Sequence, residues 1–170
     1  WYHKYINKIP ARPSVRVALG FGVHAGIAQA NMQRMNGQDL DINIVLDTMH
    51  SELARTLNEV EYVFDDLRNA NDAIARADRV IRAAAPRLDS VTGLPMLVEY
   101  AIGADQPSIM FSNGVTLLGY VDLVDANGVI SDFKVSARPK TQADVDQDLQ
   151  LALYAYAINK NAPAVNTQLV

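Results

Sequence analysis

The sequence predicts an α+β domain in which helices flank a central mixed β-sheet. The chain has 170 residues, of which 49% are hydrophobic and 20% charged, and this is enough for one ordinary domain with a full core. Segments with helical periodicity come first, short apolar runs with turn residues between them follow, and one further helical segment comes last. Helices and strands that are segregated along a chain in this way are typical of α+β domains.

Four segments have the features of helices. Residues 39–57 carry apolar side chains three and four positions apart, as on one face of an amphipathic helix. Residues 65–88 repeat this spacing, although Pro86 leaves the end of that helix undefined. The glycine-rich residues 20–26 are expected to begin a helix, and a last helix is predicted over residues 142–159.

The segment between these helices changes to short runs rich in Val, Ile, Leu, Phe and Tyr. Gly, Pro and Asn-Gly separate the runs, which indicates strands joined by tight turns. Strands are therefore predicted over residues 95–102, 108–112, 116–124 and 129–135. Neither a repeat nor a linker divides the chain, so residues 1–170 are interpreted as a single domain. A start at Trp1 without a methionine is compatible with a fragment of a longer chain.

The composition excludes several kinds of site. Without cysteine, these residues cannot form a disulfide, a zinc–thiolate site, a catalytic thiol or an iron–sulfur cluster. The formal charge of −4 gives no overall positive field for nucleic acid, but carboxylates around a metal would themselves make the charge negative. No apolar run approaches the roughly 20 residues that span a bilayer, and the start is unlike a signal peptide. We therefore expect a cytoplasmic protein that does not contact a membrane.

The segment from Gly119 to Lys134 carries the most informative chemistry. Residues two apart on a strand share a face, so Asp132 and Lys134 point the same way. A three-residue loop at positions 126–128 would pair Asp122 with Asp132 on that face. A two-residue Asn-Gly turn would put Asp122 on the opposite face. Asn-Gly in general favours the two-residue turn, but a type I turn closed by Gly128 in a left-handed bulge is also common, and only the three-residue loop permits a shared site.

Paired carboxylates beside a lysine indicate a metal site if they share a face. Like charges opposite each other across strands are destabilising, and a hard cation such as Mg²⁺ or Mn²⁺ relieves the repulsion. Lys134 could then orient or help deprotonate an attacking water and offset charge on a phosphate. The alternative is that Asp122 and Asp132 face solvent and that Lys134 is their surface ion partner.

Other polar residues are candidates for the same site. Gln147, Gln150 and Tyr154 follow each other at helical spacing, and such a row could contact DNA or hold a water. His24 follows two glycines and could supply an imidazole ligand, and Glu99 lies in an apolar run and could add an acid. An exposed helix face, a core histidine and a solvent-facing glutamate are the ordinary alternatives.

Together these pieces resemble the PD-(D/E)XK nuclease superfamily, in particular its RecB-like exonuclease branch, which includes CRISPR adaptation nucleases and phage exonucleases. The resemblance extends from residue 1 to about residue 158. It rests on the aromatic-basic residues 1–6, the glycine–histidine motif of residues 20–24, Gly119-x-x-Asp122, Asp132-x-Lys134 and Gln150-x-x-x-Tyr154.

The resemblance implies a restriction-endonuclease-like fold and a role for each matching residue. Lys134 would be the catalytic lysine, and Gln150 and Tyr154 would position the DNA or the water. Glu99 matches more loosely, and Gln147 is a further candidate. The ligands of Mg²⁺ or Mn²⁺ would be His24, Asp122, Asp132 and the carbonyl of Phe133.

The implied activity is metal-dependent hydrolysis of DNA from an end, in DNA repair, recombination or phage DNA processing. The alternatives are a catalytically silent DNA-binding or assembly module and an endonuclease of the same superfamily. Single-stranded DNA or duplex ends would be the substrate, and Arg16, Arg138 and Lys140 could meet its phosphates. A protein partner or a second copy could complete the apolar residues 164–170. Some relatives hold a 4Fe–4S cluster through cysteines outside the region matched here, so the cluster stays undecided for a longer chain.

Overall fold

A computed structural model describes residues 12–64, 67–103, 109–111, 113–136 and 140–161 of the chain. It contains helices and an antiparallel sheet, so the α+β class is confirmed. The elements in chain order are α1 (Val15–Met35), α2 (Ile42–Glu59), α3 (Ala70–Ala84), the 3₁₀ helix η2 (Ala85–Arg87), α4 (Leu88–Val91), β1 (Pro95–Ile102), β2 (Ile109–Met110), β3 (Thr116–Leu117), β4 (Gly119–Asp125), β5 (Ile130–Ser131), α5 (Gln142–Asp146) and α6 (Leu149–Asn161).

Helix α1 begins earlier than the sequence predicts. Ser14 caps it, and its hydroxyl accepts a hydrogen bond from the backbone N–H of Arg16 at 3.2 Å. The glycines of residues 20–26 therefore lie inside the helix rather than at its start. Two of them allow close packing, because a Cβ on Gly22 would lie 3.0 Å from Leu53 of α2, and one on Gly26 would lie 2.6 Å from Ile81 of α3. Helices α1, α2 and α3 consequently form one layer with its own apolar core.

Two other helices differ from the predicted ranges. The helix expected over residues 65–88 is α3, which ends at Ala84, and Pro86 then lies at the start of η2, where it needs no N–H. The helix expected over residues 142–159 is two helices, α5 and α6. It is interrupted at residues 147–148, and the Asp148 carboxylate accepts a hydrogen bond from the N–H of Gln150 at 3.0 Å. The described part of the chain has no helix with the length and apolar character needed to cross a membrane.

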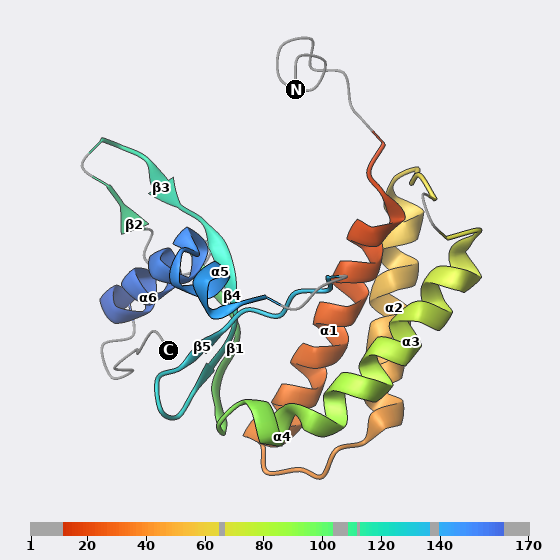
Figure 1. The fold of residues 1–170 in the computed structure, drawn as a ribbon, viewed down its shortest axis with the longest axis horizontal. Coiled ribbons are helices and arrows are strands. Elements are labelled where there is room, and N and C mark those ends of the chain that lie inside the picture. The colour runs from red at the N-terminus through yellow and green to blue at the C-terminus, as the bar shows by residue number, and fades with distance from the viewer. Residues whose placement is uncertain (1–11, 65–66, 104–108, 112, 137–139, 162–170) are drawn as a thin grey trace.

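The main sheet has the order β1-β4-β5, and both of its pairings are antiparallel. Strands β2 and β3 form a separate antiparallel pair. The mixed sheet that we expected is therefore not found among the named strands, and the parallel pairing in the described ranges is an isolated bridge between Ser14 and Val63. Figure 1 shows the sheet between the α1–α3 layer and α6. Helix α6 shares a second apolar core with β1, β4 and β5.

The hairpin between β4 and β5 has the three-residue loop. Asp125 and Val129 close it, with a hydrogen bond from Asp125 N–H to the Val129 carbonyl at 3.0 Å, and Gly128 has a φ of 80° as a left-handed bulge residue requires. Leu123 pairs with Ser131 in the ladder, so the same register places Asp122 opposite Asp132. Strand β5 ends at Ser131, earlier than predicted, and Asp132 and Lys134 follow it in extended chain outside the ladder.

Candidate active site

Segments far apart in the sequence line one cavity of about 410 Å³. Helix α1, strands β1 and β4, the chain after β5 and helix α6 all contribute side chains. The lining residues are Val17, Gly20, Phe21, His24, Glu99, Tyr120, Asp122, Asp132, Lys134, Gln150 and Tyr154. Seven of the predicted site residues therefore meet in this cavity.

A cluster of one imidazole and two carboxylates forms one part of the cavity. Ligand atoms of His24, Glu99 and Asp122 all lie within 4.8 Å of one another, and His24 Nδ1 is 3.5 Å from Asp122 Oδ2. The pairings of Val98 with Leu123 and of Tyr100 with Val121 put Glu99 across from Asp122 on the neighbouring strand. Three elements, α1, β1 and β4, thus each contribute one side chain.

Glu99 adopts an unusual backbone conformation. Its φ of 49° lies in the left-handed region. Among the described residues, Glu99 is the single non-glycine residue with a positive φ. Such a conformation costs about 1–2 kcal/mol for a residue with a Cβ. A strained residue inside a strand and beside two other ligand groups is typical of a functional position.

Lys134 is held by a second set of contacts. Its Nζ lies 2.7 Å from Asp132 Oδ2 and donates a hydrogen bond to Gln150 Oε1 at 3.3 Å. Gln150 Nε2 in turn donates to Asp132 Oδ1 at 3.3 Å and to the Tyr154 hydroxyl at 2.6 Å. Because Gln150 and Tyr154 are four residues apart on α6, the helix presents both to the hairpin.

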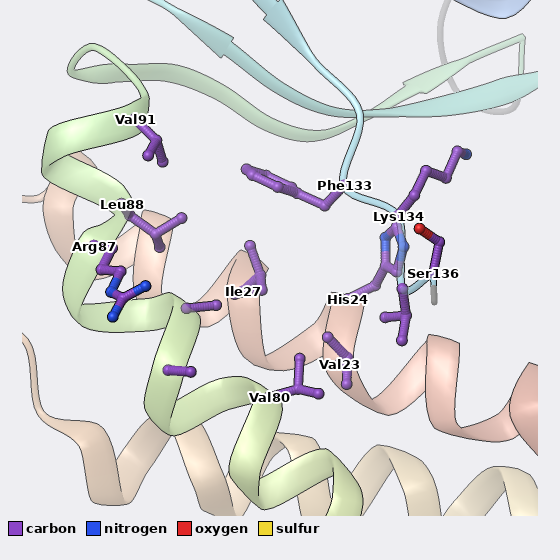
Figure 2. A pocket seen from close by; sticks show the side chains of 13 residues that line it. Val23, His24, Ile27, Val80, Arg87, Leu88, Val91, Phe133, Lys134 and Ser136 are labelled. Atoms are coloured by element: carbon purple, nitrogen blue, oxygen red, sulfur yellow. The ribbon is translucent and has the colours of Figure 1, made fainter. Parts of the chain in front are cut away.

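Phe133 joins the two sets of contacts through its backbone. Its N–H donates a hydrogen bond to Asp122 Oδ2 at 2.6 Å, which fixes that carboxylate beside the chain that carries Asp132 and Lys134. Its side chain points the other way, toward Leu88 and Val91 in a separate, largely apolar cavity of about 500 Å³ (Figure 2). His24 and Lys134 line both cavities.

Proximity and burial shift the acid–base equilibria of the cluster. Interaction with the Asp122 carboxylate, followed by the charges of Glu99 and Asp132, raises the pKa of His24 against the opposing effect of burial. Burial and the Asp122 charge raise the pKa of Glu99. Burial also raises the pKa of Asp132, although the hydrogen bond from Lys134 opposes this. Burial of the carboxylates and their closeness to one another thus both favour the protonated forms of these groups.

Lys134 and Tyr154 stay protonated near neutral pH. Burial acts to lower the pKa of Lys134, but the hydrogen bond and charge of Asp132 outweigh it and raise that pKa overall. Burial raises the pKa of Tyr154, and the charges of Asp132 and Asp122 add to this. The cavity therefore offers an ammonium group and a phenol as donors.

The donor set fits a divalent cation. Two carboxylates and an imidazole with ligand atoms within 4.8 Å are hard and borderline ligands that suit Mg²⁺ or Mn²⁺, and the imidazole favours Mn²⁺. Asp132 lies close enough to raise the pKa of His24, but its carboxylate is engaged by Lys134 and Gln150. The structural cluster thus contains Glu99, which the sequence supported less strongly than Asp132.

Among the predicted residues that the structure describes, Phe133, Gln147, Arg16 and Lys140 do not line this cavity. Gln147 is the exposed C-cap of α5, so it does not continue the row of Gln150 and Tyr154 along one helix. Arg16 lines a different small cavity. Lys140 pairs with Asp148, with Nζ 3.7 Å from Oδ2. Arg138 lies outside the described residues, as do residues 1–6 and 164–170.

Sequence reasoning missed Asp125, which fixes the hairpin. Its side chain is buried, Oδ1 accepts hydrogen bonds from Asn127 N–H at 2.8 Å and Val129 N–H at 2.9 Å, and Oδ2 accepts one from Gly93 N–H at 3.0 Å. An aspartate at the first position of a turn that contains Asn-Gly was the signal for this role. Asp125 thereby holds the loop that sets Asp122 opposite Asp132.

The fold and the site together define an α+β protein with an acidic cavity suited to a divalent cation. The sequence model of the PD-(D/E)XK nuclease superfamily matches residues 1–169, and the chain therefore belongs to that superfamily. Searches of curated proteins and of solved structures found no match. Membership supports metal-dependent nuclease chemistry on DNA, and the RecB-like branch stays a prediction from the motifs.

Proposed function

We propose that this chain hydrolyses DNA phosphodiester bonds with Mg²⁺ or Mn²⁺ and that it works from DNA ends. One observation carries the proposal: a single cavity collects the imidazole–carboxylate cluster and the lysine of the Asp132-x-Lys134 motif. Membership of the nuclease superfamily supports the same chemistry.

His24, Glu99 and Asp122 would hold the cation, and Asp132 and the Phe133 carbonyl are proposed as further ligands. A bound divalent cation supplies Lewis-acid chemistry, which polarises a phosphate and makes a water more acidic. The chain prepares this site before binding, because the Phe133 N–H orients Asp122 at 2.6 Å and the β1–β4 register brings Glu99 opposite it.

Lys134 would stabilise charge on the phosphate. Its ammonium group is held between Asp132 and Gln150, and its raised pKa keeps it protonated. A protonated lysine donates hydrogen bonds to a phosphate oxygen or orients a water, but it cannot accept a proton. Gln150, which Tyr154 fixes at 2.6 Å, would position Lys134 and Asp132 toward the substrate.

The preference for DNA ends, and for repair, recombination or phage DNA processing in the cytoplasm, is supported by the RecB-like motifs. A silent binding module on the same fold is the alternative from another class of function. The complete set of His24, Asp122, Asp132 and Lys134 favours the enzyme, because binding alone does not need all of these residues together.

A cleavage assay tests the proposal. End-labelled linear single strands, linear duplexes and closed circles are incubated with Mg²⁺, Mn²⁺ or EDTA. Metal-dependent loss of the linear forms, with the circle spared, is expected. Cutting of the circle would instead indicate an endonuclease. Metal-independent DNA binding without cleavage of any form would indicate the silent module.

Site variants show whether this cavity is responsible. Lys134→Ala and Asp122→Asn should each reduce the rate about 100-fold or more, since removal of one charge-stabilising donor costs about 10²–10³ in other enzymes. Lys160→Ala and Asp146→Asn are matched controls, because neither residue lines the cavity. Site variants as active as the parent chain would place the chemistry elsewhere.

A further inference from the structure

Two aromatic rings line the same cavity and remain largely exposed. Phe21 is 53% exposed and Tyr120 is 57% exposed, yet both contribute to the cavity that holds Asp122 and Lys134. Neither belongs to the two apolar cores formed by the described residues. Packing among the described residues thus leaves both rings accessible.

Each ring lies on the same face of its element as a residue of the imidazole–carboxylate cluster. Phe21 precedes His24 by three residues on α1, and Tyr120 precedes Asp122 by two residues on β4. The rings therefore come from two different elements and lie beside two different proposed metal ligands. Gly20, which also lines the cavity, leaves open space on α1, because apart from its own stretch of helix nothing lies within 4 Å of where its Cβ would be.

We propose that Phe21 and Tyr120 stack on the nucleobases next to the scissile phosphate, so that the site takes unpaired nucleotides. This inference rests on the proposed nuclease function and adds its substrate class. Aromatic rings bind single strands through the flat faces of the bases, which inner base pairs of a duplex keep stacked on each other. The substrate is thus a single strand or a frayed end, rather than a paired duplex.

The site needs such contacts because it has little positive charge for the DNA. Three acids and one lysine line the cavity, and in the structure that lysine is already paired with Asp132. Bound cations would reduce this negative charge, but they act on the phosphate alone. Uncharged rings can hold the adjoining nucleotides without adding to the repulsion.

Phe21→Ala and Tyr120→Ala test the inference on two substrates. One is a single-stranded oligonucleotide, and the other is an abasic strand of the same length with the same phosphates. Each substitution should raise KM for the normal strand roughly 5- to 100-fold, the range expected for loss of one base–aromatic stack. The same substitutions should change KM for the abasic strand less than twofold, because it offers no base to the ring.

Matched variants separate stacking from general effects on the cavity. Tyr120→Phe keeps the ring and should behave as the parent chain, and Val17→Ala removes apolar surface from the same cavity without removing a ring. Both substituted rings are exposed, so thermal unfolding should stay within a few degrees of the parent.

Several results would overturn the inference. Equal losses on normal and abasic strands would show that the rings act on the backbone or on the fold. Unchanged KM for the normal strand in both alanine variants would also exclude base stacking. If the parent chain cleaves neither strand, the proposed function fails instead. Anisotropy with a labelled single strand in Ca²⁺ then still decides whether ring removal weakens binding.

Discussion

Asp125→Ala is expected to destabilise the protein by about 3–5 kcal/mol. The carboxylate is 4% exposed and accepts hydrogen bonds from the N–H groups of Asn127, Val129 and Gly93. A hydrogen bond to a charged group contributes about 1.5–3 kcal/mol, and an unpaired buried donor costs about 1–3 kcal/mol. The three hydrogen bonds share one carboxylate and are only partly buried. The expected loss of stability is therefore smaller than the sum for three independent hydrogen bonds.

Urea unfolding and a thermal melt measure this change. At about 2–4 °C per kcal/mol for a domain of this size, the loss corresponds to roughly 6–20 °C in Tm. Asp39→Ala is the matched control, because Asp39 is exposed, and it should change stability by no more than about 0.5 kcal/mol. An Asp125→Ala protein within 1 kcal/mol of the parent would refute the role given to this carboxylate.

A double-mutant cycle with Gly93 sharpens the test. A Cβ on Gly93 would lie 2.3 Å from Asp125 Oδ2, so Gly93→Ala must displace the carboxylate in the parent chain. In the Asp125→Ala background that oxygen is absent, so the same glycine substitution should cost much less. Additive effects of the two substitutions would show that the clash is relieved by another movement.

Two further predictions concern stability. Arg34→Met should cost about 2–4 kcal/mol in urea unfolding, because the partly buried guanidinium donates hydrogen bonds to Asn31, Thr92 and Gly93. Arg12→Met removes only an exposed ion pair and should cost about 1 kcal/mol or less. The metal-free protein should melt at a higher temperature at pH 6 than at pH 8, because the raised pKa of His24 means that the folded state binds this proton more tightly than the unfolded state does. The raised pKa values of Glu99 and Asp132 act in the same direction at more acidic pH. This stabilisation is lost as pH rises through the raised pKa values of the folded state. Saturating Mn²⁺ should make Tm depend less on pH, because the cation takes the place of the protons. A Tm in EDTA that falls from pH 8 to pH 6 would contradict the pKa directions.

The periodicity of the sequence predicted the elements well where side-chain patterns decide them. Strand β1 has the predicted bounds of residues 95–102, because an apolar run between turn residues defines it locally. The start of α1 was wrong, since glycines usually begin or end helices. Here Gly22 and Gly26 lie inside α1 because α2 and α3 approach it closely, and that is a tertiary effect.

The candidate site was predicted through motifs, and its geometry depended on what motifs do not encode. The sequence allowed loops of two lengths, so it did not decide whether Asp122 and Asp132 share a face. The hydrogen bond from Gly93, which is distant in sequence, to Asp125 stabilises the three-residue loop that puts them on one face. Gln147 was predicted to lie in one row with Gln150 and Tyr154, and this was wrong because helical spacing holds only within an unbroken helix. The position of Glu99 beside His24 depends on the pairing of β1 with β4 and on the left-handed φ of Glu99, and the sequence predicts neither of them.

Because Glu99 has a left-handed backbone conformation, selection for thermostability in directed evolution is expected to oppose selection for activity at this position. Glycine adopts this φ without steric cost, so Glu99→Gly would relieve about 1–2 kcal/mol of backbone strain and remove one of the crowded carboxylates. A library selected only for heat resistance is therefore expected to accumulate glycine at this position and to lose affinity for the cation. Selection for heat resistance must be coupled to catalysis if the enzyme is to become robust and stay active.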